Sequence, residues 1–283
     1  MRFQLIEGDL LNEDRTVKFD GVTFPNYGWC VIMCGGPGIG KSTAYKNLVS
    51  INAKKFDVDD LKTYKLETSE LEGNKLIMKN GDVWELDGIP KPYNMSNPAF
   101  TSFVHEKTRP FARKVKQQFF NMGVKDNKET LPNIVFDITG SDIKDFQYII
   151  ENVKPLGYKI SVVWVLGDFE QAIKQNAQRG RRVDSQIVFE IHDEVLSTVR
   201  ALLRDRVMLK SIDEFWVILQ SIFDPNDPDD VFRYQSLTNV YRLKGRGDLI
   251  EMPEIIADKI DEQRRKLQAY GDETKRKKIS NKF

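Results

Sequence analysis

A glycine-rich stretch near residue 40 runs directly into a lysine and a serine. Gly35, Gly40, Lys41 and Ser42 fit the spacing G-x-x-x-x-G-K-[ST]. Glycines in such a stretch let backbone N–H groups turn inward around phosphate oxygens, and the N-terminus of a following helix adds its positive end. Lys41 would reach the β- and γ-phosphates, and Ser42 would bind Mg²⁺. The sequence therefore predicts a nucleoside triphosphate site formed by Gly35, Gly36, Pro37, Gly38, Ile39, Gly40, Lys41, Ser42 and Thr43.

Carboxylates follow two apolar stretches of the chain. Asp57, Asp59 and Asp60 come at the end of the first, and Asp137 ends the second, "NIVF". A kinase needs a carboxylate that accepts the proton of the attacking hydroxyl, and the acids near residue 59 could supply it. Asp59 or Asp60 could equally cap a helix that starts at Leu61. Asp137 has the position typical of an acid in the Mg²⁺ shell, with a simple turn residue as the alternative.

Three arginines lie in the sequence "RGRRV" between two stretches with helical spacing. They are Arg179, Arg181 and Arg182. Phosphoryl transfer builds negative charge on the γ-phosphoryl oxygens, and arginines on a mobile segment can meet that charge as the site closes. The plainer alternative is a solvated basic connection between helices.

These residues need a scaffold, and the chain alternates apolar strands with amphipathic helices. This alternation predicts a three-layer α/β fold with a mostly parallel sheet. An Asn80-Gly81 turn between apolar runs predicts a β-hairpin in an insertion. The predicted strands are Trp29–Cys34, Ala53–Asp60, Asn133–Asp137, Tyr158–Leu166 and Glu214–Leu219, and a late helix is predicted over Glu254–Gln268.

The composition of the chain limits which partners the protein can bind. The chain has 283 residues, with 43 Lys and Arg against 42 Asp and Glu, so a nucleic-acid partner would need a local basic face. The apolar runs are too short to cross a bilayer, and the first residues do not resemble a signal peptide, which predicts a cytoplasmic protein without a membrane partner. Cys30 and Cys34 are too far apart along one strand for a disulfide.

One predicted helix mixes basic and aromatic residues. Bases stack on aromatic rings while phosphates pair with Arg and Lys, so the mixture suits a polynucleotide strand. An ordinary amphipathic helix with buried aromatics explains the pattern as well. The residues are Phe103, Lys107, Arg109, Phe111, Arg113, Lys114 and Lys116.

Taken together, the motifs resemble a known group of kinases. The glycine-rich loop is followed by "DDLK", by "VFDITG" and by "RGRRV". This order resembles the kinase domain of phage polynucleotide 5′-hydroxyl kinases and is similar to zeta-toxin kinases, which phosphorylate a UDP-activated amino sugar. The resemblance covers about residues 27–219 and implies a P-loop kinase fold that uses ATP and Mg²⁺.

The resemblance also implies roles for single residues. Asp59 takes the place of the catalytic base, and Arg179 matches the lid arginine that stabilises the transition state. Lys62 stands where both groups usually have a substrate-binding arginine, and Asp137 lies at the substrate-facing end of its strand. We also expect Arg182 on the ATP side, Arg181 on the ATP or substrate side, and Asp60, Arg109 and Arg113 beside the acceptor.

The sequence thus predicts an ATP- and Mg²⁺-dependent kinase of a hydroxyl on a nucleic acid or nucleotide. Phage kinases of hydroxymethylated DNA bases belong to the same superfamily and are one such class. The alternatives are a zeta-toxin-like kinase of a nucleotide sugar and an NTP-dependent clamp or switch. The stretch "DVDDL" lacks the threonine of the Asp-x-Asp-x-Thr signature of phosphatases, so we predict no phosphatase activity. The predicted domains are an N-terminal extension (1–26), a kinase domain (27–222, insertion 63–97) and a C-terminal extension with a basic tail (223–283).

Overall fold

The structure is a computed structural model, and it describes most of the chain. The described residues are 16–19, 22–25, 28–46, 53–125, 131–220, 240–244 and 252–280, and for 16–19, 22, 25, 123–125 and 275–280 the description is limited to the backbone. The predictions for the first 15 residues of the N-terminal extension, for the join of the kinase domain to the C-terminal extension and for the side chains of the basic tail lie outside the described residues.

A six-stranded sheet forms the centre of the molecule, in the order β11-β10-β9-β3-β8-β4. All neighbouring pairs are parallel except β10 and β11. Strand β3 is buried along its whole length, as expected of a parallel strand covered on both faces. The strands are β3 (Trp29–Cys34), β4 (Lys54–Asp57), β8 (Ile134–Asp137), β9 (Lys159–Gly167), β10 (Glu214–Gln220) and β11 (Val240–Lys244).

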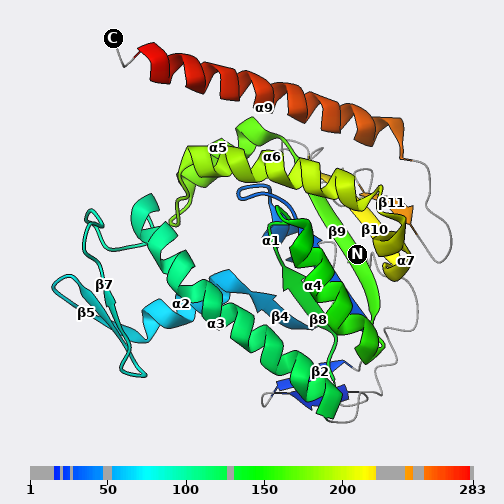
Figure 1. Ribbon diagram of the computed structural model, residues 1–283, viewed down its shortest axis with the longest axis horizontal. Helices are drawn as coiled ribbons and strands as arrows, with labels where there is room; N and C mark the ends of the chain where they lie inside the picture. The colour runs from blue at the N-terminus through cyan, green and yellow to red at the C-terminus, as the bar shows by residue number, and fades with distance from the viewer. Residues whose placement is uncertain are drawn as a thin grey trace.

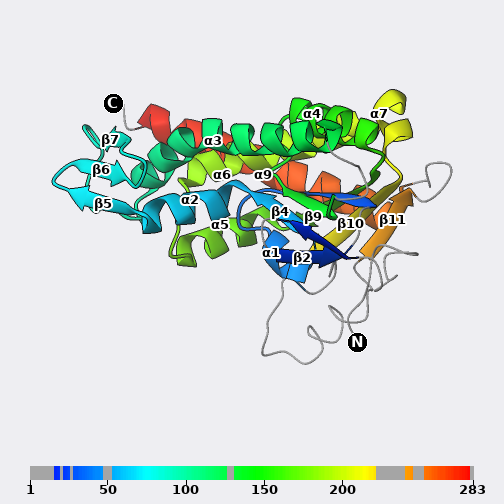
Figure 2. The same cartoon turned by 90° about the horizontal axis from the view of Figure 1, so that it is seen from below.

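Helices cover both faces of this sheet (Figures 1 and 2). Because side chains alternate along a strand, Ile32 and Cys34 face one core and Val31 and Met33 face the other. The first core contains residues of α3 (Pro98–Lys125), α4 (Ile143–Val153) and α6 (Ser185–Leu202), and the second contains residues of α1 (Lys41–Ala44) and α5 (Phe169–Gln178). The predicted three-layer α/β fold with a mostly parallel sheet is confirmed.

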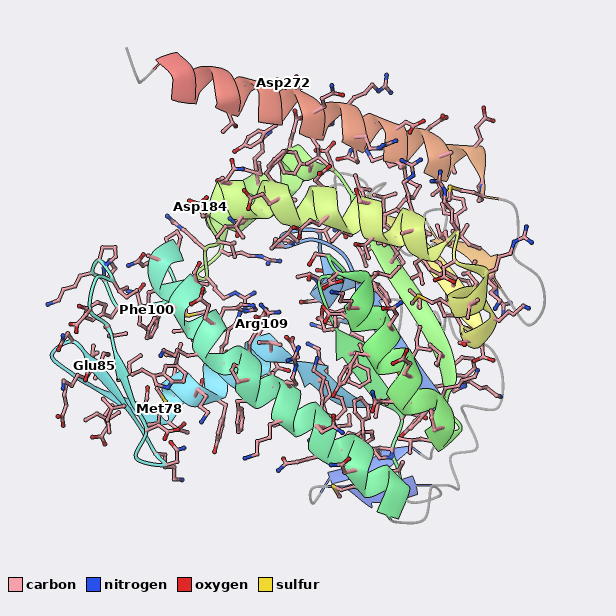
Figure 3. All side chains as sticks on the ribbon, viewed as in Figure 1. Met78, Glu85, Phe100, Arg109, Asp184 and Asp272 are labelled. Carbon is pink, nitrogen blue, oxygen red and sulfur yellow. The ribbon has the colours of Figure 1, made fainter. Side chains whose placement is uncertain are left out.

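The insertion forms a small sheet that projects beyond α2 (Figure 1). After α2 (Val58–Glu67) come β5 (Ser69–Glu72), β6 (Lys75–Met78) and β7 (Val83–Glu85) in one antiparallel sheet. The predicted hairpin is confirmed as β6 and β7, joined through Gly81 with φ of 85°. The sequence analysis missed β5, whose residues "SELE" carry no apolar run. The labelled Met78 and Phe100 belong to the core between this sheet and α3 (Figure 3).

The C-terminal region packs against the central unit. Helix α9 (Glu254–Ser280) extends beyond the predicted Gln268 and lies along α5 and α6 (Figure 1). Its Ile256, Ile260 and Leu267 belong to the same core as β3, and Gln263 Oε1 accepts a hydrogen bond of 2.7 Å from the backbone N–H that begins α5. The C-terminal region therefore completes the core.

Shorter elements complete the described structure. A hairpin of β1 (Thr16–Phe19) and β2 (Val22–Pro25) forms a sheet of its own, and α7 (Arg206–Ser211) precedes β10. None of the helices in the described ranges combines the length and the apolar character needed to cross a membrane.

Candidate active site

The glycine-rich loop lies between the end of β3 and the start of α1, as its spacing predicted. Gly38 and Gly40 have φ of 79° and 83°, in a region that L side chains rarely adopt. A Cβ on Gly38 would clash with the carbonyl oxygen of Ala172, and one on Gly40 with the side chain of Gln220. Glycine is therefore favoured at both positions by φ, and at Gly38 the backbone of α5 also leaves no room for a side chain.

Lys41 folds back over this loop. Its Nζ donates a 2.8 Å hydrogen bond to Gly35 O and lies 3.9 Å from Asp137 Oδ1. Lys55 Nζ lies 3.7 Å from the other oxygen of Asp137 and 2.7 Å from Asp57 Oδ2. Burial raises the pKa of Asp137, and Lys41 only partly opposes this effect. Asp137 thus joins the loop lysine to the acids that follow β4.

The acids after β4 occupy different positions from those the sequence predicted. Strand β4 ends at Asp57, and helix α2 begins at Val58 rather than Leu61. Asp57 caps this helix, because its Oδ1 accepts a 2.8 Å hydrogen bond from the N–H of Asp59. Asp59 and Asp60 lie in the first turn, so neither is the helix cap and both carboxylates are available for other contacts.

Asp59 is held by two cations. Lys62 Nζ donates a 2.9 Å hydrogen bond to its Oδ1, and Arg181 pairs with its Oδ2. Although burial opposes ionisation, these two cations lower the pKa of Asp59 to about 2. Lys62 itself is 5% exposed, and burial lowers its pKa despite the attraction of Asp59. Asp60, whose side chain is 68% exposed, lies 3.9 Å from Lys55 and has no such clamp.

The lid segment, residues 179–184 between α5 and α6, provides one of these cations. Arg181 contacts Asp59, whereas the sequence analysis gave the principal role to Arg179. Burial and the nearby Arg181 lower the pKa of Arg179, and Asp59 raises it. Arg179 therefore lies close to both Arg181 and Asp59. The Arg182 side chain is exposed, and its backbone N–H donates a 2.9 Å hydrogen bond to Met95 O of the insertion.

Asn176 shapes the lid segment, and the sequence analysis missed it. Its side-chain amide donates to Val183 O at 2.7 Å and accepts from Val183 N at 3.1 Å. The residue is 3% exposed. Asn176 therefore closes the segment into a loop between α5 and α6. An asparagine near the end of a helix is too common a feature to have revealed this role.

Helix α3 adds a second group of charges. Figure 3 shows Arg109 on the side of α3 that faces the glycine-rich loop and the lid segment. His105, one turn earlier, was missed; burial, Lys62 and Arg109 lower its pKa to about 4, and Arg181 acts in the same direction. The i, i+4 spacing of His105 and Arg109 is a signal that could have indicated a shared helix face.

The remaining predicted residues of α3 are divided between surface and core. Arg113 is exposed, and burial together with Arg113 and Arg109 lowers the pKa of Lys116, whose Nζ lies 6.0 Å from the Phe136 ring centroid. Phe103 packs edge-on against Trp84 of β7, with the two ring centroids 6.2 Å apart. Lys107 Nζ lies 5.5 Å from the centroid of the Phe103 ring, and Lys65 Nζ lies 4.5 Å from the centroid of the Phe111 ring. The amphipathic-helix alternative therefore describes Phe103 correctly.

The site offers oxygen atoms of the kind that Mg²⁺ binds. Ser42, in the first turn of α1, is exposed, and Asp137 has a carboxylate at the end of β8. A magnesium ion bound with nucleotide phosphates typically needs one or two protein ligands, with phosphate and water completing the shell, so this pair fits. Within the described residues, no group of three or more His, Cys, Asp or Glu could hold a metal ion by itself.

Comparison with known proteins supports the fold. No protein family profile and no curated protein matches the sequence. Among solved structures, the AvrRxo1-ORF1:AvrRxo1-ORF2 complex crystallised with sulphate ions is similar with a TM-score of 0.54 at 11% identity, over 82% of this chain and 63% of that chain. This chain thus spans less than two thirds of the length of that protein.

Two further structures match with TM-scores below 0.5. The PezAT toxin–antitoxin system of Streptococcus pneumoniae has a TM-score of 0.42 at 11% identity, over 86% of this chain and 87% of that chain. Deoxyadenosine kinase from M. mycoides with bound dATP has a TM-score of 0.28 at 15% identity, over 74% and 96%. The likeness to the AvrRxo1 complex shows a shared fold, and the chain has a three-layer P-loop fold.

Proposed function

We propose that the protein is an ATP- and Mg²⁺-dependent phosphotransferase whose acceptor is a hydroxyl group of a nucleotide or nucleic acid. The observation that carries this proposal is a continuous network of charged groups. It runs from Lys41 of the phosphate loop through Asp137, Lys55 and Asp57 to Asp59, whose backbone N–H is bound by Asp57. The network joins a phosphate-binding lysine to a carboxylate held by the lid.

On the donor side, the loop 35–40 and the N-terminus of α1 hold the phosphates through backbone N–H groups. Lys41 exchanges its bond to Gly35 O for the β- and γ-phosphates. Ser42 and Asp137 would hold the Mg²⁺ ion, which would neutralise charge on the phosphates.

On the acceptor side, Asp59 accepts the proton of the attacking hydroxyl. The acceptor oxygen forms its bond to the γ-phosphorus as the bond to the β-phosphate oxygen breaks, and ADP leaves. A carboxylate with a pKa of about 2 is a weak base, so the acceptor must replace Arg181 beside Asp59. Arg181, released in this way, and Arg179 then face the charge that develops on the transferred group.

The charges around the acceptor favour an anionic molecule. Lys62 and Arg109 lie near enough to His105 to lower its pKa, and Arg113 and Lys116 continue this group of cations along α3. This excess of positive charge suits an acceptor that carries phosphate, such as a nucleic-acid end or a nucleotide.

A specific observation supports a second candidate, the kinase of a nucleotide sugar. A polynucleotide would stack its bases on aromatic rings, but Phe103 is packed against Trp84 and a lysine lies over each of the rings of Phe103 and Phe111. A nucleotide sugar needs the phosphate-binding charges and no row of stacking rings. Its chemistry at Asp59 would be the same.

A transfer assay tests both candidates. The protein is incubated with Mg²⁺ and ATP labelled at the γ-phosphate, together with 5′-hydroxyl oligonucleotides, hydroxymethylated DNA, nucleotides or UDP-activated amino sugars. We expect label in one acceptor class and none without Mg²⁺. Tight ATP binding with no label in any acceptor would contradict the proposal and favour a nucleotide-dependent clamp or switch.

A further inference from the structure

His192 of α6 lies directly against the outer side of the phosphate loop. Its Nε2 is 3.0 Å from the carbonyl oxygen of Pro37, and its ring fills the space that a Cβ on Gly36 would need. The side chain is 8% exposed. Because a carbonyl oxygen can only accept a hydrogen bond, Nε2 carries the proton and donates it to Pro37 O.

This contact determines the direction of the next backbone N–H group. A trans peptide unit is planar, so its C=O and N–H bonds point in opposite directions. When His192 holds Pro37 O on the outer side of the loop, the N–H of Gly38 in the same peptide unit is directed to the opposite, inner side. The inner side is where phosphate oxygens accept hydrogen bonds in this type of loop.

The loop would not hold this orientation by composition alone. Gly38 has φ of 79°, and glycine adopts positive and negative φ with similar ease. A rotation of the Pro37–Gly38 peptide unit would turn its carbonyl oxygen towards the phosphates and its N–H away from them. Such a rotation would replace an attractive contact by a repulsive one.

His192 is itself held firmly in place. The ring of Phe169 packs edge-on against it at 5.6 Å, and the N–H of Phe169 is bound by Gln263 of α9. Burial and the nearby Lys41 lower the pKa of His192 to about 4, although its bond to Pro37 opposes this shift. The ring is therefore neutral at pH 7 and has one N–H to donate.

We propose that His192 is a positioning residue for the nucleotide phosphates, because it holds the Pro37–Gly38 peptide unit with the Gly38 N–H directed into the loop. The proposal rests on the proposed function to the extent that the loop must bind a nucleoside triphosphate. It does not depend on phosphate transfer, so nucleotide binding alone can test it.

The test compares two substitutions in the full-length protein. His192→Phe keeps a flat ring against Phe169 but loses the donor, whereas His192→Gln places an amide N–H near the position of Nε2. Binding of ATP, ADP and adenosine is measured by calorimetry, and the melting temperature is measured without nucleotide. We expect His192→Phe to weaken ATP and ADP binding by about tenfold and His192→Gln by no more than about threefold, with adenosine unchanged.

Other outcomes would overturn the inference. If His192→Phe binds ATP as tightly as the wild type, or if both variants weaken adenosine and ATP equally, the histidine acts only through packing. Should the Phe variant fail to fold, His192→Met serves as the donor-free variant. If the wild type binds ATP but transfers no phosphate, the proposed function fails while this comparison still decides the role of His192. If the wild type binds no nucleotide, both fail.

Discussion

The donor side and the acceptor side of the candidate site are built in different ways. The donor side is built on the backbone of the single stretch 35–43, packed from outside by α5, α6 and β10, with the side chains of Lys41, Ser42 and Asp137 added to it. The acceptor side consists of charged side chains from separate segments, with Asp59 and Lys62 on α2, Arg109 on α3 and Arg181 on the lid segment. Backbone packed in this way is preformed, whereas side chains on different segments can exchange partners.

The two sides therefore respond differently to a bound ligand. Gly38 and Gly40 have positive φ, and a Cβ on Gly38 would meet the backbone of Ala172, so the loop is closely packed in the shape it already has. The Arg181–Asp59 pair links two half-exposed side chains on separate segments, and such a pair contributes little stability. We infer that ATP meets a prepared site and that the acceptor must rearrange its own. Each prediction below tests one side of this contrast.

The largest effect is expected on the donor side, at Lys41. Lys41→Ala removes the cation that would reach the β- and γ-phosphates, so phosphate transfer should fall by about 10³-fold or more. The fold should persist, since the loop is held by backbone geometry and by packing. Transfer rates and melting temperatures of the two proteins check this. A folded variant with substantial activity would contradict the proposed function.

The next largest effect is expected on the acceptor side, at Asp59. Asp59→Asn keeps the size of the side chain but cannot accept a proton, so transfer should fall by about 10²-fold or more while the ATP dissociation constant changes little. Because Lys62 is buried beside Asp59, this variant should also melt at a lower temperature.

Asp60→Asn is the matched control for this substitution. Asp60 lies in the same helical turn, its side chain is mostly exposed and 3.9 Å from Lys55, and neither Lys62 nor Arg181 pairs with it, so its substitution should lower transfer much less than that of Asp59. If Asp60→Asn is the damaging change and Asp59→Asn is harmless, the assignment of the base is off by one residue.

The contrast between the two sides also explains what could be predicted from the sequence. The phosphate loop and the apolar strands are determined by residues close together in the chain, so spacing and periodicity were sufficient to predict them. Asp57 was missed as the helix cap because three aspartates within four residues are equivalent until the end of β4 is known. The pairing of Arg181 with Asp59 joins residues more than a hundred positions apart, and no local pattern encodes it.

One strand was missed, and one helix was predicted too short, because their composition is misleading. Strand β5 is acidic and polar, and it is held in its sheet by pairing with β6 rather than by an apolar face of its own. Helix α9 has helical spacing that weakens after Gln268, yet Tyr270 still packs against Phe169 and Phe189. In both cases tertiary contacts determine the structure where local propensity is weak.

The two lid arginines, Arg179 and Arg181, should affect the reaction in different ways. Arg179→Ala should lower kcat by about tenfold and change the KM for ATP little if it acts in the transition state. Arg181→Ala should also raise the pKa of Asp59, because one of the two cations that lower it is lost.

The pH dependence of activity tests the direction of this shift in the pKa of Asp59. Asp59 must be ionised to accept a proton, so activity that depends on it is lost as pH falls through its pKa. With an Asp59 pKa of about 2, that loss is expected near pH 2 in the free wild-type protein, and in Arg181→Ala it should occur at a higher pH. Profiles of kcat/KM for the two proteins check this, since kcat/KM reports the free enzyme. Identical acidic limbs would show that Arg181 does not control Asp59.

The smallest effect is expected at the outer edge of the acceptor side, where Arg109 and Arg113 lie. If about three phosphates of a single-stranded acceptor are neutralised here, the logarithm of its affinity should fall with the logarithm of salt concentration with a slope of about −2. Replacing both arginines with Gln should flatten the slope and raise the KM of the acceptor a few-fold, while the KM for ATP stays constant. The KM values, measured from low to physiological salt, check both expectations.

An acceptor KM that changes neither with salt concentration nor with the two substitutions would remove the support for a polynucleotide, because an extended chain of phosphates cannot bind α3 without displacing counterions. The nucleotide-sugar candidate would survive that result, since Lys62 and the lid arginines could hold its two phosphates near Asp59 without help from the outer part of α3.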